Sequence, residues 1–566
     1  MILNKPGQKV ILLGNEAIVR GALESGVQFI STYPGTPTSE IGNIFYEISK
    51  GKSQNFYFEF STNEKVALEA AIGASFSGLK TLVAMKGFGL NVCSDSLLPF
   101  AYTGNKGATV IVVGDDPSCW SSAQSEQDSR AYSYLTHLPT LEPSDPQECK
   151  DFTKLGFKIS EKFKIPVIIR TTTRVNHQSM PVRLEKLQEK GNKFLTGKFV
   201  KNPKEFVTMP PRVLEMKKRL LGKIKKIKNF SENSPLNKFY RGRASANSKL
   251  GIVTSGISYL HVMEALKELN LNLPVFKLGF FYPLAEEKIK NFIKNLEKIL
   301  VVEELEPYLE KEIKRLAKDV NPSLQIFGKN LLPQFGELKP ETVALAISKI
   351  TNKEFSVPKF IFKGLKHLPR FCSGCPYWQV FSVVKKVAPK NTVFGGDIGC
   401  YMMAGLSPHF LQDYLSSMGS SIGIAHGISK SNIEQKVIAF IGDSTFFHAG
   451  IPALINTVFN KSNPLIIILD NGTTAMTGHQ PYPGSAVRID SEYKYEWEGY
   501  LPSLETPEKP IKIEDIVLAC GVKNLKIVDS FKIQEIEKAI KEFLPKKEVS
   551  VIIARGMCAL LAKSLK

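Results

Sequence analysis

The fold of this sequence is constrained most by two apolar runs that each end in polar residues. Residues 437–441 (VIAFI) lead into Gly442-Asp443-Ser444, and residues 465–469 (LIIIL) lead into Asp470-Asn471. Asp443 and Asn471 are separated by 28 positions, the length of one strand–helix–strand unit. Such a unit places the carboxyl ends of two parallel strands side by side. The two oxygen-bearing side chains are therefore expected at one sheet edge, beside the N-terminus of the connecting helix.

The chemistry of these residues favours a metal–diphosphate site. A hard cation such as Mg2+ takes oxygen ligands in near-octahedral geometry and commonly keeps a phosphate as a partner. A helix N-terminus favours the same phosphate, because its backbone N–H groups point toward the ligand. The unit around Asp443 and Asn471 is therefore predicted to bind a Mg2+-bound diphosphate.

The rest of the chain repeats the alternation of strands and helices. Apolar runs at 10–13, 81–84, 108–113 and 166–169 alternate with helical patterns, and further runs follow at 252–254, 298–302 and 549–554. This alternation is typical of a multi-domain α/β protein with parallel sheets. The 566 residues are predicted to divide into four segments: a first α/β domain at 1–184, a basic linker at 185–247, a smaller α/β domain at 248–352, and a last α/β domain at 353–566.

The composition narrows the class of protein. The net charge is +20, and much of the excess falls between Lys217 and Lys228. We expect a solvated linker or helix face there; nucleic acid and an acidic protein partner are alternatives, but no nucleic-acid-binding motif accompanies the charge. No apolar run approaches the length of a membrane span, and residues 1–7 lack signal-peptide architecture. A cytoplasmic protein that binds neither nucleic acid nor membrane is expected.

The unit around Asp443 resembles the thiamine diphosphate motif, Gly-Asp-Gly followed by Asn-Asn one strand–helix–strand unit later. Ser444 replaces the last glycine and Asp470 the first asparagine. That cofactor also needs a carboxylate beside its aminopyrimidine, supplied in such enzymes by a glutamate of a second α/β domain. Glu64 is the candidate, since a strand ends at residue 60 and a helix follows, and ligands bind at that edge of such sheets. The alternative is a glutamate favoured by the dipole of a first helical turn.

Two further loops carry candidate residues. Thr36 lies in a hydroxyl-rich turn (YPGTPTS, 33–39) that either caps a helix or contacts a substrate carboxylate. Cys372 and Cys375 form a Cys-x2-Cys turn, while Cys400 and Cys558 each follow a strand-like run. Four thiolates bind zinc or an iron–sulfur cluster, and the spacing alone leaves both open. The other four cysteines (Cys93, Cys119, Cys149 and Cys520) are expected to be packing residues.

Together these motifs resemble the 2-oxoacid:ferredoxin oxidoreductases, and within them the large (alpha) subunits of the indolepyruvate enzymes. The matching stretches span nearly the whole chain: 14–17 (GNEA), 33–37 (YPGTP), 63–69 (NEKVALE), 89–92 (GLNV), 372–376 (CSGCP), 396–401 (GDIGCY), 442–448 (GDSTFFH) and 470–481 (DNGTTAMTGHQP).

The resemblance implies cofactors and roles. It implies two thiamine-diphosphate-type domains, which bind the pyrimidine and the diphosphate, flanking a transketolase C-terminal-like domain. Asp443, Asn471 and the Thr473 carbonyl would hold Mg2+ and diphosphate, with Gly442 and Ser444 beside them. Glu64 would activate the cofactor and Thr36 would meet the 2-oxoacid. Cys372, Cys375, Cys400 and Cys558 would hold a [4Fe-4S] cluster.

The substrate and the partners are also expectations from the resemblance. Met476 stands where pyruvate-specific members carry a polar residue, and a thioether suits an aryl-type 2-oxoacid such as indolepyruvate. The expected reaction is oxidative decarboxylation to an acyl-CoA and CO2, with electrons passed to ferredoxin. His479 is the preferred proton-handling residue over His426 and His448. A smaller subunit is expected in a dimer of heterodimers.

Two departures from the family pattern affect these expectations. The chain ends eight residues after Cys558, without the ferredoxin-like domain that usually ends these subunits. Family members also tend to have a histidine where Gly87 or Phe88 stands.

Two alternative functions remain. One is a non-oxidative thiamine diphosphate decarboxylase or carboligase, and the other is a non-catalytic basic binding subunit.

Overall fold

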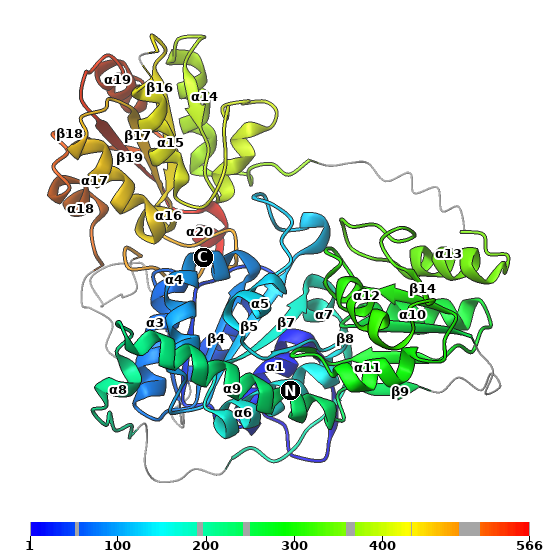
Figure 1. Ribbon diagram of the computed structural model, residues 1–566. Helices are drawn as coiled ribbons and strands as arrows, with labels where there is room; N and C mark the ends of the chain where they lie inside the picture. The colour runs from blue at the N-terminus through cyan, green and yellow to red at the C-terminus, as the bar shows by residue number, and fades with distance from the viewer. Residues whose placement is uncertain are drawn as a thin grey trace. The chain divides into compact units, whose positions relative to one another are not determined.

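The computed structural model describes residues 2–50, 56–188, 196–240, 249–357, 368–431, 433–485 and 510–564. The chain divides into two compact units, Met1–Ile361 and Phe362–Lys566. Both are built from parallel-rich sheets covered by helices (Figure 1), so the predicted α/β class is confirmed. None of the helices within the described ranges combines the length and apolar character needed to span a membrane.

The first unit is built on a seven-stranded sheet of order β12-β6-β7-β5-β4-β2-β3. Its strands are β2 (Phe29–Thr32), β3 (Tyr57–Phe60), β4 (Thr81–Lys86), β5 (Thr109–Asp115), β6 (Thr140–Leu141), β7 (Val167–Thr172) and β12 (Phe280–Tyr282). All neighbours are parallel except β12, which runs antiparallel to β6. β4 and β5 are buried along nearly their whole length, because helices cover both faces of the sheet.

The helices lie on opposite faces of this sheet. They are α1 (Gly14–Glu24), α2 (Ser39–Ser49), α3 (Glu64–Phe76), α4 (Gly87–Thr103) and α6 (Pro146–Phe163). α1 packs on α2 and α6, whereas α3 packs on α4. Because right-handed crossovers fix the side of each helix, α2 leaves β2 toward one face and α4 leaves β4 toward the other. β2 and β4 are neighbours, so the carboxyl ends of these two strands flank the switch point where ligands bind in such sheets.

A second sheet completes this unit, with the order β14-β13-β10-β11-β9. Its strands are β9 (Lys238–Tyr240), β10 (Leu250–Ser255), β11 (Val275–Leu278), β13 (Lys298–Val302) and β14 (Gln325–Phe327), covered by α10 (Ser258–Glu268), α11 (Glu286–Ile293), α12 (Tyr308–Val320) and α13 (Pro340–Thr351). The basic run lies on the helix α9 (Arg212–Glu232), which buries Met216, Leu220 and Ile227. It is a helix face, as expected.

One strand differs from its prediction. β1 (Lys9–Leu13) does not join the parallel sheet but pairs antiparallel with β8 (Ser179–Arg183) in a two-stranded sheet. Lys9 and Ile11 are exposed on it, and Leu12 is buried. An alternating pattern of this kind is typical of a half-exposed antiparallel strand rather than a central parallel one.

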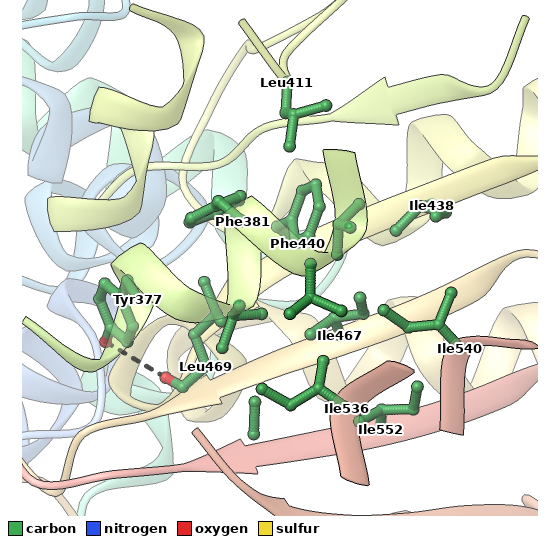
Figure 2. Close-up of a cluster of buried hydrophobic side chains, with 14 of the residues drawn as sticks. Tyr377, Phe381, Leu411, Ile438, Phe440, Ile467, Leu469, Ile536, Ile540 and Ile552 are labelled. Carbon is green, nitrogen blue, oxygen red and sulfur yellow. Dashed lines mark hydrogen bonds between the residues drawn. The ribbon is translucent and has the colours of Figure 1, made fainter. Parts of the chain in front are cut away.

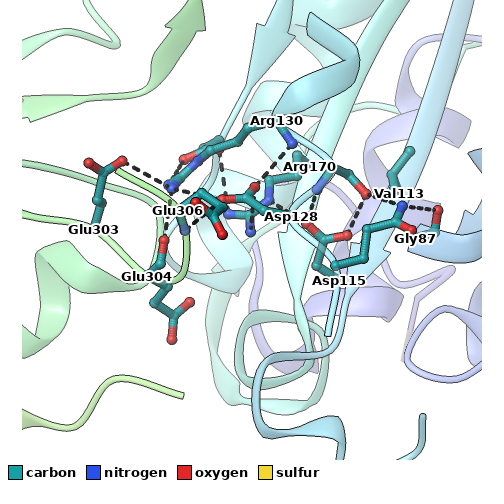
Figure 3. Close-up of polar contacts among 12 residues, drawn as sticks. Gly87, Val113, Asp115, Asp128, Arg130, Arg170, Glu303, Glu304 and Glu306 are labelled. Atoms are coloured by element: carbon teal, nitrogen blue, oxygen red, sulfur yellow. Dashed lines mark hydrogen bonds and ion pairs between the residues drawn. The ribbon is translucent and has the colours of Figure 1, made fainter. Parts of the chain in front are cut away.

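Two buried arginines form a charge network in the first unit, and Arg130 connects its two larger sheets (Figure 3). Arg130 donates from Nε to Glu142 (2.6 Å) and lies 3.4 Å from Glu303, which follows β13. Arg170, on β7, donates from Nε to Asp115 (2.8 Å) at the end of β5. Burial dominates at Glu303 and raises the pKa of its carboxyl to about 7, although Arg130 opposes the rise. The network fixes Asp115 directly behind the N-terminus of α4.

The second unit holds a five-stranded parallel sheet of order β15-β16-β17-β19-β18. The strands are β15 (Val393–Gly395), β16 (Val437–Gly442), β17 (Leu465–Asp470), β18 (Asn524–Asp529) and β19 (Ser550–Arg555). The main helices are α14 (Pro376–Val387), α15 (Ser420–Ser429), α17 (Ile451–Phe459), α18 (Ile513–Ala519), α19 (Ile533–Phe543) and α20 (Ala559–Ser564).

A separate apolar core covers each face of this sheet. On one face, Phe381 of α14 and Ile536 and Ile540 of α19 pack on Phe440 and Ile467 (Figure 2). On the other face, α15, α17 and α18 pack on the alternate residues of the same strands. Because residues alternate between the faces, strands buried on both sides read as the continuous apolar runs seen in the sequence. The Tyr377 hydroxyl lies 3.4 Å from the Leu469 carbonyl oxygen near the sheet edge (Figure 2).

Candidate functional site

Asp443 ties together the two loops that follow β16 and β17. It is 3% exposed. Its Oδ2 atom accepts hydrogen bonds from the backbone N–H groups of Asn471 (3.0 Å) and Gly472 (2.8 Å) and from the Tyr482 hydroxyl (3.0 Å). Its Oδ1 atom accepts from the Ser444 N–H (2.8 Å). The structure therefore brings Asp443 and Asn471 together, as the strand–helix–strand spacing predicts.

The electrostatics at this edge suit a cation. Burial and, to a smaller extent, the nearby Asp470 raise the pKa of the Asp443 carboxyl to about 8. Asp470 is itself paired with Arg555 (2.7 Å), which also holds Glu514. A bound divalent cation would favour the charged form of Asp443, because opposite charge offsets the cost of burial. The donor set of carboxylate, amide oxygen and backbone carbonyl fits Mg2+.

The loop after β17 carries the remaining residues of the predicted diphosphate site. Asn471 Oδ1 accepts from the Thr473 N–H (3.1 Å), and the Thr473 hydroxyl donates to the Gln480 carbonyl (3.3 Å). The Thr474 hydroxyl donates to Ser444 Oγ (2.9 Å), which joins this loop to the segment after Gly442. Met476 lies in the same loop and is 47% exposed, so its thioether is open to a ligand.

The four predicted cluster cysteines gather at the same edge of the second unit. The Cys375 N–H donates to the Cys372 carbonyl in a tight turn at the start of α14. The Cys558 N–H donates to the Asn471 carbonyl (3.2 Å). Burial is the largest cause that raises the pKa of Cys400 to about 12, and Cys375, Cys558 and Cys372 contribute in the same direction. Mutual electrostatic influence of this kind places the four thiols in one neighbourhood.

The thiols are not in coordination geometry. Among the residues that the structure describes, no group of three or more His, Cys, Asp or Glu side chains is arranged to hold a metal ion. His479 lies against this group rather than over the diphosphate loop, with its Nε2 atom 3.5 Å from Cys558 Sγ. Its backbone is left-handed (φ 62°), after Gly478 at φ 121°. The contact favours a role for His479 beside the thiols.

In the first unit, Glu64 opens α3 after β3. It is 7% exposed, and the preceding Asn63 caps the helix by accepting from the Val66 N–H (2.9 Å). Gly89 of α4 leaves room for the glutamate stem, because a Cβ there would lie 2.8 Å from Glu64 Cγ. The buried thiol of Cys93 is close enough to Glu64 for the carboxylate to help raise its pKa. Glu64 is thus held between α3 and α4 at the sheet edge.

Thr36 lies in the loop after β2, at the same edge of the first unit's sheet. It is half-buried, and its carbonyl accepts from the Ser121 hydroxyl (3.3 Å). The loop is braced by the Thr38 hydroxyl, which donates to the Gly35 carbonyl (2.9 Å), and by Asn15, which donates to the Pro37 carbonyl (2.8 Å). Thr36 and Glu64 therefore follow the neighbouring strands β2 and β3 at the same edge of the sheet.

Some buried polar residues at these edges were missed by the sequence analysis. Asp397 accepts from the N–H groups of Gly419 (2.7 Å) and Ser421 (2.9 Å), which fixes the start of α15. Tyr482 holds Asp443, and Lys86 ends β4 beside the Thr36 loop. A lysine that directly follows the apolar run at 82–85 is a signal that could have identified Lys86, since charged residues rarely end buried strands without a partner.

Family comparisons agree with this layout. Residues 397–554 match the model of the C-terminal TPP binding domain of thiamine pyrophosphate enzymes. Residues 20–225 match that of the thiamine diphosphate-binding part of pyruvate flavodoxin/ferredoxin oxidoreductase, and residues 240–370 match an indolepyruvate oxidoreductase domain. The fold and these matches define a thiamine diphosphate-dependent oxidoreductase.

Full-length relatives give the family. The chain is 41% identical over 580 residues to the indolepyruvate oxidoreductase subunit IorA of Methanothermobacter thermautotrophicus, covering 100% of this chain and 89% of the relative. It is 40% identical to the IorA subunit of Pyrococcus horikoshii, over 99% of this chain and 87% of the relative. The chain belongs to the IorA family of indolepyruvate oxidoreductase subunits. A solved 2-oxoglutarate:ferredoxin oxidoreductase from Magnetococcus marinus aligns over 61% of this chain and 66% of its own, with 16% identity and a TM-score of 0.48.

Proposed function

We propose that the chain catalyses the oxidative decarboxylation of an aryl-type 2-oxoacid, such as indolepyruvate, to its acyl-CoA and CO2. Electrons would pass through a [4Fe-4S] cluster to ferredoxin. One observation supports the proposal: the Cys558 N–H donates to the Asn471 carbonyl (3.2 Å), so one of the four proposed cluster ligands lies against the proposed diphosphate loop. A redox cluster beside a thiamine diphosphate site suits an enzyme that removes electrons from its substrate.

The residues of the second unit would hold the diphosphate end of the cofactor. Asp443, Asn471 and the Thr473 carbonyl would bind Mg2+, while Gly442 and Ser444 approach the phosphates at the N-terminus of the helical segment that follows. Bound thiamine diphosphate supplies a nucleophilic carbon and an electron sink for the electron pair that remains when CO2 departs. The protein contributes orientation and keeps the charged groups out of water, which strengthens their interactions.

Glu64 would act on the other end of the cofactor. A buried carboxylate that hydrogen-bonds the aminopyrimidine favours the tautomer able to take up the activating proton. Its fixed position between α3 and α4 reduces the reorganisation needed at each turnover. Thr36 would meet the 2-oxoacid from the neighbouring loop.

The cysteines would hold the cluster. Cys372, Cys375, Cys400 and Cys558 supply four thiolates, the ligand set of a [4Fe-4S] centre. The pKa of Cys400 is raised by burial and by the neighbouring thiols, and metal binding would favour the thiolate forms because the ligands must lose their protons. Coordination would require the thiols to draw closer than they lie in the protein alone.

The substrate class and the partners follow from the loop residues and from the relatives. The half-exposed Met476 suits an aromatic side chain, since thioether–aromatic contacts are favourable. The relatives are subunits of indolepyruvate oxidoreductases. We propose that this chain also acts as a subunit, with a smaller second subunit in a dimer of heterodimers and with coenzyme A and ferredoxin as reaction partners. The predicted division at residues 184, 247 and 352 belongs to the same proposal.

One experiment tests the function. The chain is purified anaerobically with its partner subunit, and viologen reduction is followed with indolepyruvate, phenylpyruvate and pyruvate, with and without coenzyme A. Reduction should be fastest with an aryl 2-oxoacid and should require coenzyme A. Reduction with none of the three acids would exclude the oxidoreductase proposal. Iron-free protein that still releases CO2 would favour a non-oxidative decarboxylase, and a chain in which Glu64→Ala changes nothing would favour a non-catalytic subunit.

A further inference from the structure

Lys86 ends β4 at the switch point of the first unit. Its Nζ atom donates to the Ser121 carbonyl (2.8 Å) and lies 5.4 Å from the centre of the Phe88 ring. Among the residues that the structure describes, no carboxylate lies within ion-pair distance of this ammonium group. The negative charge of Asp116 reaches this ammonium group only at longer range. An ammonium group has three N–H donors, and the Ser121 carbonyl uses one of them, so the others are available to an anionic ligand.

The two nearest acids are already engaged. Asp116 accepts from the Ser121 N–H (2.8 Å) and from the hydroxyls of Ser122 and Thr173 (both 2.6 Å). Asp115 is held by Arg170 and by the Ser129 N–H (2.9 Å). Each acid is fixed by its own partners, so neither can swing toward the lysine without giving up hydrogen bonds. The ammonium remains available to an incoming group.

The surroundings of Lys86 form a small cavity. Its lining holds one basic residue, Lys86, and two acids, Asp115 and Asp116, together with Gly87, Phe88 and Ser122. Gly87 has to be small here, because a Cβ at this position would lie 2.5 Å from Asp115 Oδ1. The lack of a side chain at Gly87 thus helps to keep the space beside the lysine open.

The cavity lies between the two residues proposed to act on substrate and cofactor. A Cβ on Gly35, next to Thr36, would lie 2.9 Å from Lys86 Cβ. Ser121 bridges the two segments, because its hydroxyl donates to the Thr36 carbonyl while its own carbonyl accepts from Lys86. On the other side, Gly89 in the first turn of α4 packs against Glu64. An anion on Lys86 would therefore sit at the reacting end of the first unit.

We propose that Lys86 anchors the carboxylate of the 2-oxoacid substrate, a proposal that rests on the proposed function. One ammonium group matches the single negative charge of one carboxylate. The phosphates of coenzyme A are the other anions of the reaction, but several charges clustered on one ligand favour several cations. The bound carboxylate orients the keto group of the substrate toward the cofactor. Lys86 takes no part in the electron transfer itself, so it is a positioning residue.

The protonation of Lys86 gives the site a pH signature. Burial lowers the pKa of Lys86 to about 8, while Asp116 and Cys119 act in the opposite direction. The ammonium is therefore present below pH 8 and is lost above it. Because kcat/KM reports the free enzyme, kcat/KM for the 2-oxoacid should fall above about pH 8. An arginine stays charged and should remove that fall.

The test uses the anaerobic two-subunit complex with Lys86→Met, Lys86→Arg and a matched control, Lys80→Met, at the opposite end of the same strand. Lys86→Met should raise KM for the 2-oxoacid about 10- to 100-fold, the usual effect of losing a hydrogen bond to a charged group, with kcat changed less than about threefold. KM for coenzyme A and the content of thiamine diphosphate should match the wild type. Lys86→Arg should restore KM and extend activity to higher pH, and Lys80→Met should behave as the wild type.

The alternative outcomes are distinct. A raised KM for coenzyme A with an unchanged KM for the 2-oxoacid would assign the anion to a phosphate and overturn the proposal. A lowered kcat with both KM values unchanged would also overturn it. Calorimetric binding of indolepyruvate distinguishes failure of the Lys86 anchor from failure of the proposed function. If the wild type binds the acid more tightly than Lys86→Met but reduces no viologen, only the proposed function is contradicted. Equal binding by wild type and Lys86→Met contradicts the anchor.

Discussion

Asp443→Asn separates the cofactor role of Asp443 from its structural role. In the free protein, Oδ2 accepts three hydrogen bonds and Oδ1 accepts one. An asparagine can turn its oxygen toward the three donors, which leaves its amide group facing the Ser444 N–H. One unsatisfied buried donor costs about 1–3 kcal/mol. The protonated carboxyl of the wild type carries a similar mismatch, since burial raises its pKa to about 8. The free variant should therefore stay folded.

Cofactor binding should respond very differently. At 100 times the dissociation constant, Mg2+ and thiamine diphosphate stabilise the wild type by about 2.7 kcal/mol. Hydrogen exchange in β16 and β17 should then slow by about 100-fold. Local exchange is the suitable assay because a chain of two units does not unfold in one step. Asp443→Asn should show no slowing, whereas Asp529→Asn, at the end of β18, should behave as the wild type. Full protection of Asp443→Asn by the cofactor would refute the assigned role.

Three further changes test other parts of the account. Glu64→Gln should lower kcat by about 10²- to 10⁴-fold with thiamine diphosphate still bound, while the exposed Glu69→Gln on the same helix should have no effect; equal activity of the two variants would remove Glu64 from the mechanism. Cys400→Ser should reduce iron content after anaerobic reconstitution, and Cys520→Ser should not; full iron in both would move the cluster elsewhere. Arg170→Met should destabilise the first unit by about 3–5 kcal/mol because it leaves the buried Asp115 carboxylate without its partner. Lys249→Met, in an exposed pair with Glu297, should cost about 0–1 kcal/mol. Thermal unfolding that ranks the two variants in the reverse order would contradict the buried-network argument.

The local features that the sequence predicted share one physical origin. The strands ending at Gly442 and Asp470 are buried on both faces, so their apolar runs are continuous and their ends are marked by the first polar residues. The spacing between Asp443 and Asn471 then follows from the geometry of one crossover. β1 was misassigned because four apolar residues in a row do not distinguish a central strand from an edge strand with Leu12 alone facing inward.

The features that the sequence could not predict depend on contacts between distant segments. Arg130 meets Glu303 only because the two sheets of the first unit pack together. Lys86 lacks a close ion pair because Ser121, Ser122 and Thr173 engage Asp116. His479 was expected to handle protons near the diphosphate loop, and its contact with Cys558 depends on how that loop closes. The pattern and spacing of residues in the sequence identify helices and strands. Which buried side chains contact one another depends on the three-dimensional packing of the chain.

The central claim is that electrons leave a 2-oxoacid through thiamine diphosphate and enter an iron–sulfur cluster held by this chain. The most direct test is the visible absorption of the reconstituted complex, mixed anaerobically with indolepyruvate and no external acceptor. The account predicts bleaching of the cluster absorption in the wild type. It predicts no bleaching by indolepyruvate in Glu64→Ala. Dithionite should still bleach the cluster of that variant. An unchanged spectrum in a wild type that contains iron and thiamine diphosphate, or bleaching by indolepyruvate in Glu64→Ala, would contradict it.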